Sequence, residues 1–438
     1  MRFTSGKLIR QLFAALCVLA LFATACGSDS DTETSTTDSA SSSTTDDVAS
    51  DGEPEEAMEE EEAMEEEASV CPHDNDTVFL FGPYEANQPA GVNWRAGVDH
   101  AIADVNDGGG ILGCTVEIEW QDTQADPDVS KQVVAEGAEK NPYAIIGPMF
   151  SGSTIVNMVE AQRAQIPQIV GSESPAITNR AENGDNDFIF RTSFGGDNSA
   201  PKLTQFMLAE GVSKIDIIFK NDEFGAGGAG AQKDSMIAAG IEIGEEITIQ
   251  PEQIDLSAEV SQLANSDSDA VFVFFSEIET GAFFSEVAAQ GFDKQLYGAD
   301  PLTSGASIEL ATPGSADGAK SHSGVVADAP EFADWLAAHQ AFHPDLTGID
   351  HNNIKGYLGI HVLKEVTERM GEFDRVSFPA NLHCAAITTA DEPGVLLDVT
   401  YDGNGDVDRE SFIVEVIDGV GTVGTTVPTL DNLSERGC

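Results

Sequence analysis

Residues 141–175 read NPYAIIGPMFSGSTIVNMVEAQRAQIPQIVGSESP, and this stretch decides the fold. An apolar run at 144–146 leads into the small polar turn SGST (151–154), which a helical pattern follows. A second apolar run, 166–170, ends in the polar turn GSESP (171–175). Two strands that end in small polar loops are typical of a ligand site at the carboxyl edge of an open α/β sheet. Backbone amides at the start of the helix favour a carboxylate there, and no catalytic pattern is present.

The same alternation of strand and helix continues outward along the chain. It predicts an α/β fold of parallel sheets with helices on both faces. Since about 365 residues exceed one typical core, we expect two lobes, with a boundary near residues 194–198. The expected strands are 78–81, 115–120, 144–146, 167–170, 188–191, 214–219, 243–249, 270–275 and 295–298.

The N-terminus has the pattern of an export signal. Arg2, Lys7 and Arg10 precede an apolar run over residues 12–23, which is too short to span a bilayer comfortably. The run ends in ATAC (23–26), which resembles a bacterial lipobox. We therefore expect residues 1–25 to be a lipoprotein signal peptide and Cys26 to be lipidated. Ordinary cleavage and release is the alternative.

A strongly acidic segment follows the signal. Residues 27–70 contain 17 Asp or Glu and no Lys or Arg, and they repeat EEAMEE at 55–60 and 61–66. Such a segment buries too little apolar surface to offset its chain entropy, so we expect residues 26–70 to be a lipidated cysteine plus a disordered tether. A charged helix in the Glu/Ala/Met part is the alternative.

The rest of the chain is also acidic. The formal net charge is −55; the signal contributes +3 and the tether −17, which leaves −41 on residues 71–438. This charge argues against nucleic acid or an anionic membrane surface as a partner, because both require basic patches.

Four cysteines lie beyond the tether, in an exported chain where disulfides are favoured. Cys71 and Cys114 each precede one of the first two strands, and parallel strands begin at the same sheet edge. We therefore expect a Cys71–Cys114 disulfide, which leaves Cys384 to pair with Cys438. A zinc site is the alternative, although no short Cys-x-x-Cys spacing supports it.

Two other patterns resemble metal sites, and we expect neither to bind a metal. His339 and His343 have i, i+4 spacing, but no Glu follows the first, and we expect a solvated helix face. The stretch DGNGD (402–406) lacks the Gly and Glu that a calcium loop needs at its sixth and twelfth positions. We expect it to be the turn of a hairpin between strands 395–401 and 412–417.

Several stretches, in this order and spacing, make the chain resemble the type I periplasmic binding proteins. It looks closest to the leucine/isoleucine/valine-binding branch, and the resemblance covers about residues 76–419. The stretches are GVDHAIADVNDGGGILGCTVEIEWQDTQADP (97–127), AIIGPMFSGST (144–154), SPAIT (174–178), FIFRTSF (188–194) and KNDEFGAGG (220–228).

The resemblance implies two doubly wound parallel-sheet lobes, joined by a multi-strand hinge, with the ligand cleft between them. We expect residues 71–195 to form the first part of the N-terminal lobe and residues 196–325 the C-terminal lobe. Residues 326–380 then return to the N-terminal lobe. The segment 381–438, with its hairpin, is expected to pack on the C-terminal lobe.

In that family an amino-acid ligand lies between the lobes. The resemblance implies that its carboxylate binds loops matching Ser151, Gly152, Ser153 and Thr154, and Ser172, Glu173 and Ser174. In the second lobe the matching residues are Phe224, Ser276 and Asp300, with Glu279 as a second candidate partner for the ligand ammonium. Glu173 replaces a common Thr, and Ser276 a common Tyr, so the pocket suits a different or larger ligand, such as an amine or amide.

The function that follows is a lipid-anchored extracytoplasmic solute-binding protein. It would capture an amino acid or related small polar ligand by lobe closure and deliver it to the permease subunits of an ABC importer. No cofactor and no enzymatic activity are expected, and the membrane contact would be the lipid anchor on the outer face of the cytoplasmic membrane. The alternatives are a ligand-sensing module for a membrane receptor and an exported hydrolase, for which no nucleophile–base pattern is present.

Overall fold

The computed structural model describes residues 70–179, 186–327, 329–430 and 432–438. The expected signal peptide, Cys26 and the tether up to residue 69 lie outside these residues. Among the described residues, no helix has the length and apolar character needed to cross a membrane.

The first lobe is built on a five-stranded sheet of order β2-β1-β3-β4-β5, in which every pair is parallel. The strands are β1 (Thr77–Tyr84), β2 (Thr115–Asp122), β3 (Ala144–Ile146), β4 (Gln168–Val170) and β5 (Ile189–Arg191). The helices are α1 (Pro89–Asp107) and α11 (His351–Met370) on one face, and α2 (Pro127–Glu139) and α3 (Ser151–Ala164) on the other. Two cores pack on this sheet: Val78 and Leu80 of β1 pack with α1 and α11, and Ile145 of β3 packs with α2 and α3.

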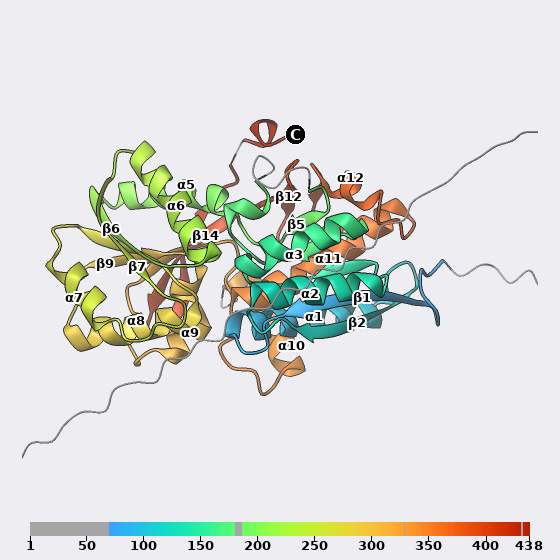
Figure 1. Cartoon of the computed structure of the whole chain (residues 1–438), viewed down its shortest axis with the longest axis horizontal. Coiled ribbons are helices and arrows are strands. Elements are labelled where there is room, and N and C mark those ends of the chain that lie inside the picture. The colour runs from blue at the N-terminus through green and yellow to red at the C-terminus, as the bar shows by residue number, and fades with distance from the viewer. Residues whose placement is uncertain (1–69, 180–185, 328, 431) are drawn as a thin grey trace, which may run out of the picture. The chain divides into compact units, whose positions relative to one another are not determined.

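The second lobe is built on a seven-stranded sheet of order β15-β14-β10-β9-β8-β6-β7. Figure 1 labels its strands β6, β7, β9 and β14. The pairs from β7 to β10 are parallel, and β14 and β15 add an antiparallel edge. Its strands are β6 (Lys214–Lys220), β7 (Glu242–Ile249), β8 (Ala270–Phe274), β9 (Gln295–Gly298), β10 (Lys320–Ser323), β14 (Ser411–Ile417) and β15 (Val420–Val427). Helices α5 (Gly196–Ala209) and α6 (Glu223–Ala238) cover one face, and α7 (Ser257–Asn265) and α8 (Glu277–Gln290) the other.

The nine predicted strands between residues 76 and 298 are all present, with end shifts of a few residues. Two strands of the second sheet were not predicted. The strand β10 has the sequence KSHS, which carries no apolar signal, and β15 is rich in Gly and Thr. Each forms a strand because it pairs with a neighbour: β10 pairs with β9, and β15 pairs with β14. These strands therefore depend on tertiary contacts and not on the local sequence.

The prediction that DGNGD (402–406) is a hairpin turn is confirmed, but the predicted second strand, 412–417, is wrong. The partner of β12 (Val399–Tyr401) is the short β13 (Val407–Asp408), and both join β11 (Ala386–Ile387) in a separate three-stranded sheet. Val399 and Val407 pack in the core of the first lobe, whereas β14 pairs with β10 and β15. Within the segment 381–438, β14 and β15 belong to the second sheet, whereas residues of β11, β12 and β13 pack in the core of the first lobe.

The chain passes between the two sheets after β5, after β10 and after β13. The described residues thus contain three connections between the lobes, in agreement with a multi-strand hinge. Buried charges pack around these connections: Lys202 of α5 donates to Asp408 at 2.9 Å and to the Arg409 carbonyl at 3.1 Å, and Arg409 donates to the Thr192 carbonyl at 2.9 Å.

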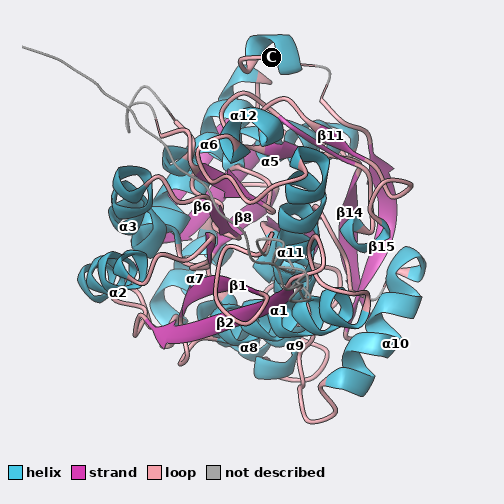
Figure 2. Cartoon of the chain, turned by 90° about the vertical axis from the view of Figure 1, so that its right-hand side faces the viewer, coloured by secondary structure: helices cyan, strands magenta, loops and turns pink. Residues whose placement is uncertain are grey.

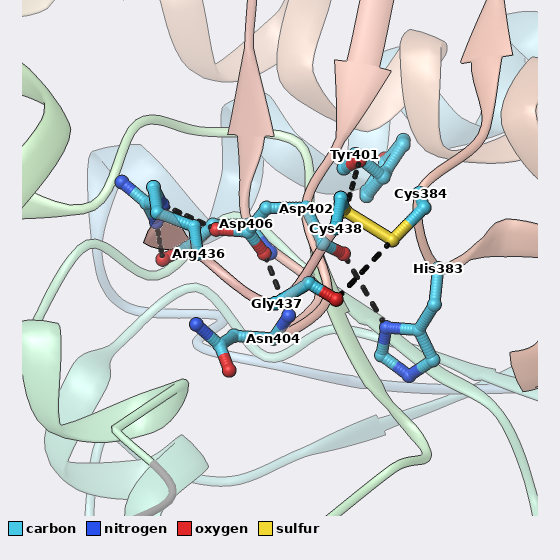
Figure 3. The surroundings of a disulfide bond; sticks show 9 residues. All are labelled: His383, Cys384, Tyr401, Asp402, Asn404, Asp406, Arg436, Gly437 and Cys438. Carbon is cyan, nitrogen blue, oxygen red and sulfur yellow. Dashed lines mark hydrogen bonds and ion pairs between the residues drawn. A yellow bond between two sulfur atoms is a disulfide. The ribbon is translucent and has the colours of Figure 1, made fainter. Parts of the chain in front are cut away.

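Both predicted disulfides are confirmed, as Cys71–Cys114 and Cys384–Cys438. The second one fixes the end of the chain beside the DGNGD turn (Figure 3). There Arg436 pairs with Asp402 at 2.5 Å and with Asp406 at 2.7 Å. The acidic side chains of this turn are therefore neutralised by the protein's own arginine.

Close packing of α1 against α11 positions the start of α11. A Cβ on Gly97 would lie 1.8 Å from the Asn353 carbonyl oxygen, and one on Gly356 would lie 2.3 Å from the Trp94 carbonyl oxygen, so any side chain there would separate the helices. Asp350 and Asn353 form a capping box that begins α11. Figure 2 shows α11 beside α1. The remaining helices are α9 (Gly305–Leu310), α10 (Ala333–Phe342) and α12 (Phe378–Leu382).

Candidate functional site

A cavity of about 360 Å³ lies between the two sheets. Its lining comes from the loops that follow β1, β2, β3 and β4 in the first lobe and β6, β7, β8 and β9 in the second, together with the start of α11. These loops stand at the carboxyl ends of parallel strands, which is where open α/β sheets bind ligands. The lining residues are Gln88, Ala90, Ala125, Pro127, Met149, Phe150, Ser151, Gly152, Ser153, Gly171, Glu173, Lys220, Asp222, Phe224, Pro251, Glu252, Ser276, Glu277, Glu279, Pro301, His351 and Asn352.

The first-lobe side of the cavity is the start of α3. Ser151 accepts a hydrogen bond from the Ser174 amide at 3.1 Å, and this bond joins the two polar turns. The Ser153 hydroxyl is different: it is buried, lines the cavity and has no hydrogen-bond partner among the described residues. A buried hydroxyl normally has a hydrogen-bond partner, so Ser153 is an exception to this rule.

A buried acid that the sequence analysis missed holds this turn in place. The Glu85 carboxylate accepts hydrogen bonds from the Met149 amide at 3.2 Å and the Phe150 amide at 3.1 Å. Burial raises the pKa of Glu85 to about 7. Nothing in its local sequence indicates this role, because its partners lie more than 60 residues away.

The second-lobe side is charged. Lys220, at the end of β6, donates to Ser276 at 2.5 Å, pairs with Asp222 at 2.9 Å and lies 3.9 Å from Glu279. Its ammonium also lies 5.6 Å from the ring centroid of Phe150, which belongs to the first lobe. The Lys220 ammonium is therefore shared by the Asp222 and Glu279 carboxylates and faces the Phe150 ring across the cavity.

Glu277, the first residue of α8, was also missed by the sequence analysis, although its neighbour Ser276 was predicted. Glu277 is buried, with a relative exposure of 3%, and it lines the cavity. Its hydrogen-bond partner is the Asn352 amide of α11 at 3.1 Å, and it forms no ion pair with any described residue. Burial raises the pKa of Glu277 above its ordinary value.

Lys355 of α11 joins the two lobes beneath the cavity. Its ammonium donates to Glu173 of the first lobe at 2.5 Å and pairs with Asp300 of the second lobe at 2.8 Å. Burial opposes the charge of Lys355, but the Asp300 and Glu173 carboxylates raise its pKa above the ordinary value. For Glu173 the effect of burial is larger, and its pKa rises to about 7.

This arrangement changes the expected role of Asp300. Asp300 does not line the cavity, and it already has an ammonium partner in Lys355, with His351 at 4.0 Å. Glu173, Asp300 and His351 could otherwise gather around a metal ion, but the Lys355 ammonium stands between the two carboxylates. The Lys355 ammonium therefore occupies the position that a metal ion would take.

The histidine pattern on α10 was expected to be a solvated helix face, and this expectation is wrong. His339 is fully buried, with Nδ1 3.2 Å from Nδ1 of His100 and Nε2 3.1 Å from the Asn353 amide. Burial lowers the pKa of His339 to about 3. Its role in the structure is to pack α10 against α1 and α11.

Most of the predicted site residues line the cavity, and a few lie behind the residues that line it. Thr154 and Ser172 hydrogen bond to each other at 2.6 Å, and the Ser174 hydroxyl accepts from the Ala176 amide, so these three residues support the polar turns without lining the cavity. The predicted residues that do line the cavity are Ser151, Gly152, Ser153, Glu173, Phe224, Ser276 and Glu279.

Comparison with known proteins gives the same fold and a family. Residues 79–420 match the family described as periplasmic binding protein. The Leu/Ile/Val-binding protein BraC3 of Rhizobium johnstonii is 24% identical over 352 residues, which cover 78% of this chain and 91% of the relative.

Two solved structures share the fold. One is the branched-chain amino acid transporter substrate-binding protein LivJ of Streptococcus pneumoniae with isoleucine, at TM-score 0.70 and 17% identity, over 80% of this chain and 99% of LivJ. The other is a Rhodopseudomonas palustris ABC transporter solute-binding protein with benzoate, at TM-score 0.73 and 19% identity, over 83% and 99%. The chain therefore belongs to the periplasmic binding protein family, as a type I member similar to the leucine/isoleucine/valine-binding proteins, and it is a binding protein and not an enzyme.

Proposed function

We propose that this chain is a lipid-anchored extracytoplasmic solute-binding protein that captures an amino acid or related small polar ligand and delivers it to an ABC importer. The observation that carries the proposal is the cavity lined by the carboxyl-edge loops of both sheets. BraC3 is named for Leu, Ile and Val, and the solved relatives hold isoleucine and benzoate, so small carboxylates are the ligands of similar proteins.

Contacts between the two lobes support capture by lobe closure. Asn352 contacts Glu277, Lys355 contacts Asp300, and Lys220 faces Phe150, each pair with one partner from either lobe. A ligand between such surfaces favours the closed arrangement by the difference in its affinity for the closed and open states. The proposal includes delivery to permease subunits because of the family, and anchoring through Cys26 because of the lipobox-like N-terminal sequence.

A thermal-shift screen tests the proposal. The purified chain is heated with amino acids, aromatic acids, amides and amines, and the melting temperature is followed as a function of ligand concentration. A true ligand raises the melting temperature progressively with concentration, as mass action requires. The absence of any concentration-dependent shift across the panel would contradict a solute-binding role.

The free hydroxyl of Ser153 gives a local test of the site. We expect Ser153→Ala to lower the affinity for the ligand found in the screen by about 3- to 10-fold, because one neutral hydrogen bond is lost. Stability should change little, since the hydroxyl has no partner in the protein. Ser261→Ala, on an exposed position of α7, is the matched control. Titration calorimetry measures both variants, and unchanged affinity in Ser153→Ala would place the ligand elsewhere.

A further inference from the structure

We propose that Gly227 of α6 is the contact at which the second lobe closes on the first, and that it sets how closely the two lobes approach each other. The inference rests on the proposed function and assigns its closure step to a residue that does not line the cavity. It comes from the space around Gly227, where the two lobes meet without room for a side chain.

Gly227 belongs to the second lobe, but its nearest neighbours belong to the first. A Cβ on Gly227 would lie 2.7 Å from Oγ of Ser174, 3.5 Å from its Cβ and 3.4 Å from Cδ of Pro175. Ser174 and Pro175 stand in the turn that follows β4 of the first sheet. Real Cβ atoms essentially never lie closer than 3.0 Å to such a neighbour, so any side chain at position 227 requires something to move.

The turn of the first lobe is held at three points and resists such a movement. The Ser174 hydroxyl accepts a hydrogen bond from the Ala176 amide at 3.4 Å, and the Ser174 amide donates to the Ser151 hydroxyl at 3.1 Å. The Ser174 carbonyl accepts from the buried Arg191 guanidinium at 2.9 Å. Displacing Ser174 would therefore disturb several hydrogen bonds within the first lobe.

The helix on the other side of the contact cannot retreat either, because α6 already touches its own sheet. A Cβ on Gly228 would lie 2.0 Å from the Phe274 ring, and one on Gly225 would lie 2.0 Å from the Lys220 carbonyl oxygen. Since neither the turn nor the helix has room to give way, a large side chain at position 227 would keep the two lobes apart.

The contact is directly connected to the walls of the cavity. Phe224 lies three residues before Gly227 on α6, where residues share one face of a helix, and it lines the cavity. On the first lobe, Glu173 lines the cavity and directly precedes Ser174. The approach of Gly227 to Ser174 therefore determines how far apart these two walls stand when the lobes are closed.

A leucine at position 227 tests this inference, and a leucine at position 230 is the matched control. A Cβ on Gly230, also in α6, would have no neighbour within 4 Å. Both substitutions replace Gly with a better helix former, so we expect neither to lower the melting temperature of the full chain without ligand. Isoleucine and benzoate, which the two solved relatives hold, serve as probes in titration calorimetry.

We expect Gly227→Leu to lower the affinity for these probes by about 10- to 100-fold, because the added side chain overpacks only the closed arrangement. Gly230→Leu should keep the wild-type affinity, because its side chain meets open space. The comparison separates an effect on closure from an effect on the helix itself, since both variants change the helix in the same way.

A second experiment needs no ligand. In the full chain with Cys17→Ser and Cys26→Ser, Ser174→Cys and Gly227→Cys place two Cβ atoms 3.5 Å apart, at the short end of the range of about 3.5–4.5 Å found in disulfides. We expect oxidised glutathione to join the two thiols, as measured by thiol titration. Gly230→Cys in place of Gly227→Cys is the control and should leave both thiols free.

The outcomes separate the inference from the proposed function. Free thiols in the protein with Ser174→Cys and Gly227→Cys, or wild-type affinity in Gly227→Leu, would overturn the closure contact and leave solute binding intact. Failure of every compound in the screen to bind would contradict the proposed function. In that case the disulfide experiment would still decide whether Gly227 meets Ser174.

Discussion

Replacing Lys355 with methionine lowers the free energy of unfolding by about 3–5 kcal/mol, which is the usual effect of removing one partner from a buried ion pair. The Lys355 side chain is 1% exposed, and its ammonium serves both Glu173 and Asp300. Methionine keeps the length of the side chain and leaves two carboxylates buried without a cation. Urea unfolding, followed by circular dichroism, measures the loss.

Two further variants show whether the charge is the cause. Lys131→Met, at an exposed position of α2, should change the stability by no more than about 0.5 kcal/mol. Adding Glu173→Gln and Asp300→Asn to Lys355→Met removes the unpaired charges, and we expect it to recover most of the lost stability. If the single Lys355 variant unfolds at the same urea concentration as the wild type, the ion pairs of Lys355 with Glu173 and Asp300 contribute nothing to the folded state.

Arg191→Met should have a comparable effect, a loss of about 3–5 kcal/mol, together with weaker ligand binding. The guanidinium is fully buried and pairs with Asp406. It also donates to the carbonyls of Ser172 at 3.3 Å and Ser174 at 2.9 Å. These two carbonyls flank Glu173, so the arginine holds the polar turn that lines the cavity.

The measurement combines urea unfolding with ligand titration calorimetry. Arg191→Lys keeps the positive charge but lacks the planar set of guanidinium N–H donors. We expect it to retain part of the stability while still loosening the 172–174 turn. Arg163→Met, with a side chain that is 73% exposed, is the control and should cost no more than about 1 kcal/mol. Wild-type ligand affinity in a destabilised Arg191→Met protein would show that the turn does not depend on this arginine.

The predicted polar turns are in place, but the way in which they are held could not be predicted. Glu85 reaches the amides of Met149 and Phe150, and Arg191 reaches the 172–174 turn, from positions distant in the sequence. Polar residues of this kind look like ordinary surface residues in a sequence, because nothing local to them signals burial. Only the tertiary structure gives them partners and removes them from water.

Local patterns in the sequence predicted most of the strands and the sheet edge at which the site lies. Strand–helix alternation depends on local apolar periodicity, so the nine strands were predictable, and consecutive parallel strands place Cys71 beside Cys114. Pairing between residues far apart in the sequence was not predictable. Strand β12 pairs with β13 and not with residues 412–417. Asp300 was expected to pair with a cation of the ligand, but it pairs with Lys355, which also pairs with Glu173, 182 residues away in the sequence. Charge compensation depends on which side chains meet in space, and the folded chain therefore decides that Lys355 serves Glu173 and Asp300 while Asn352 donates to Glu277.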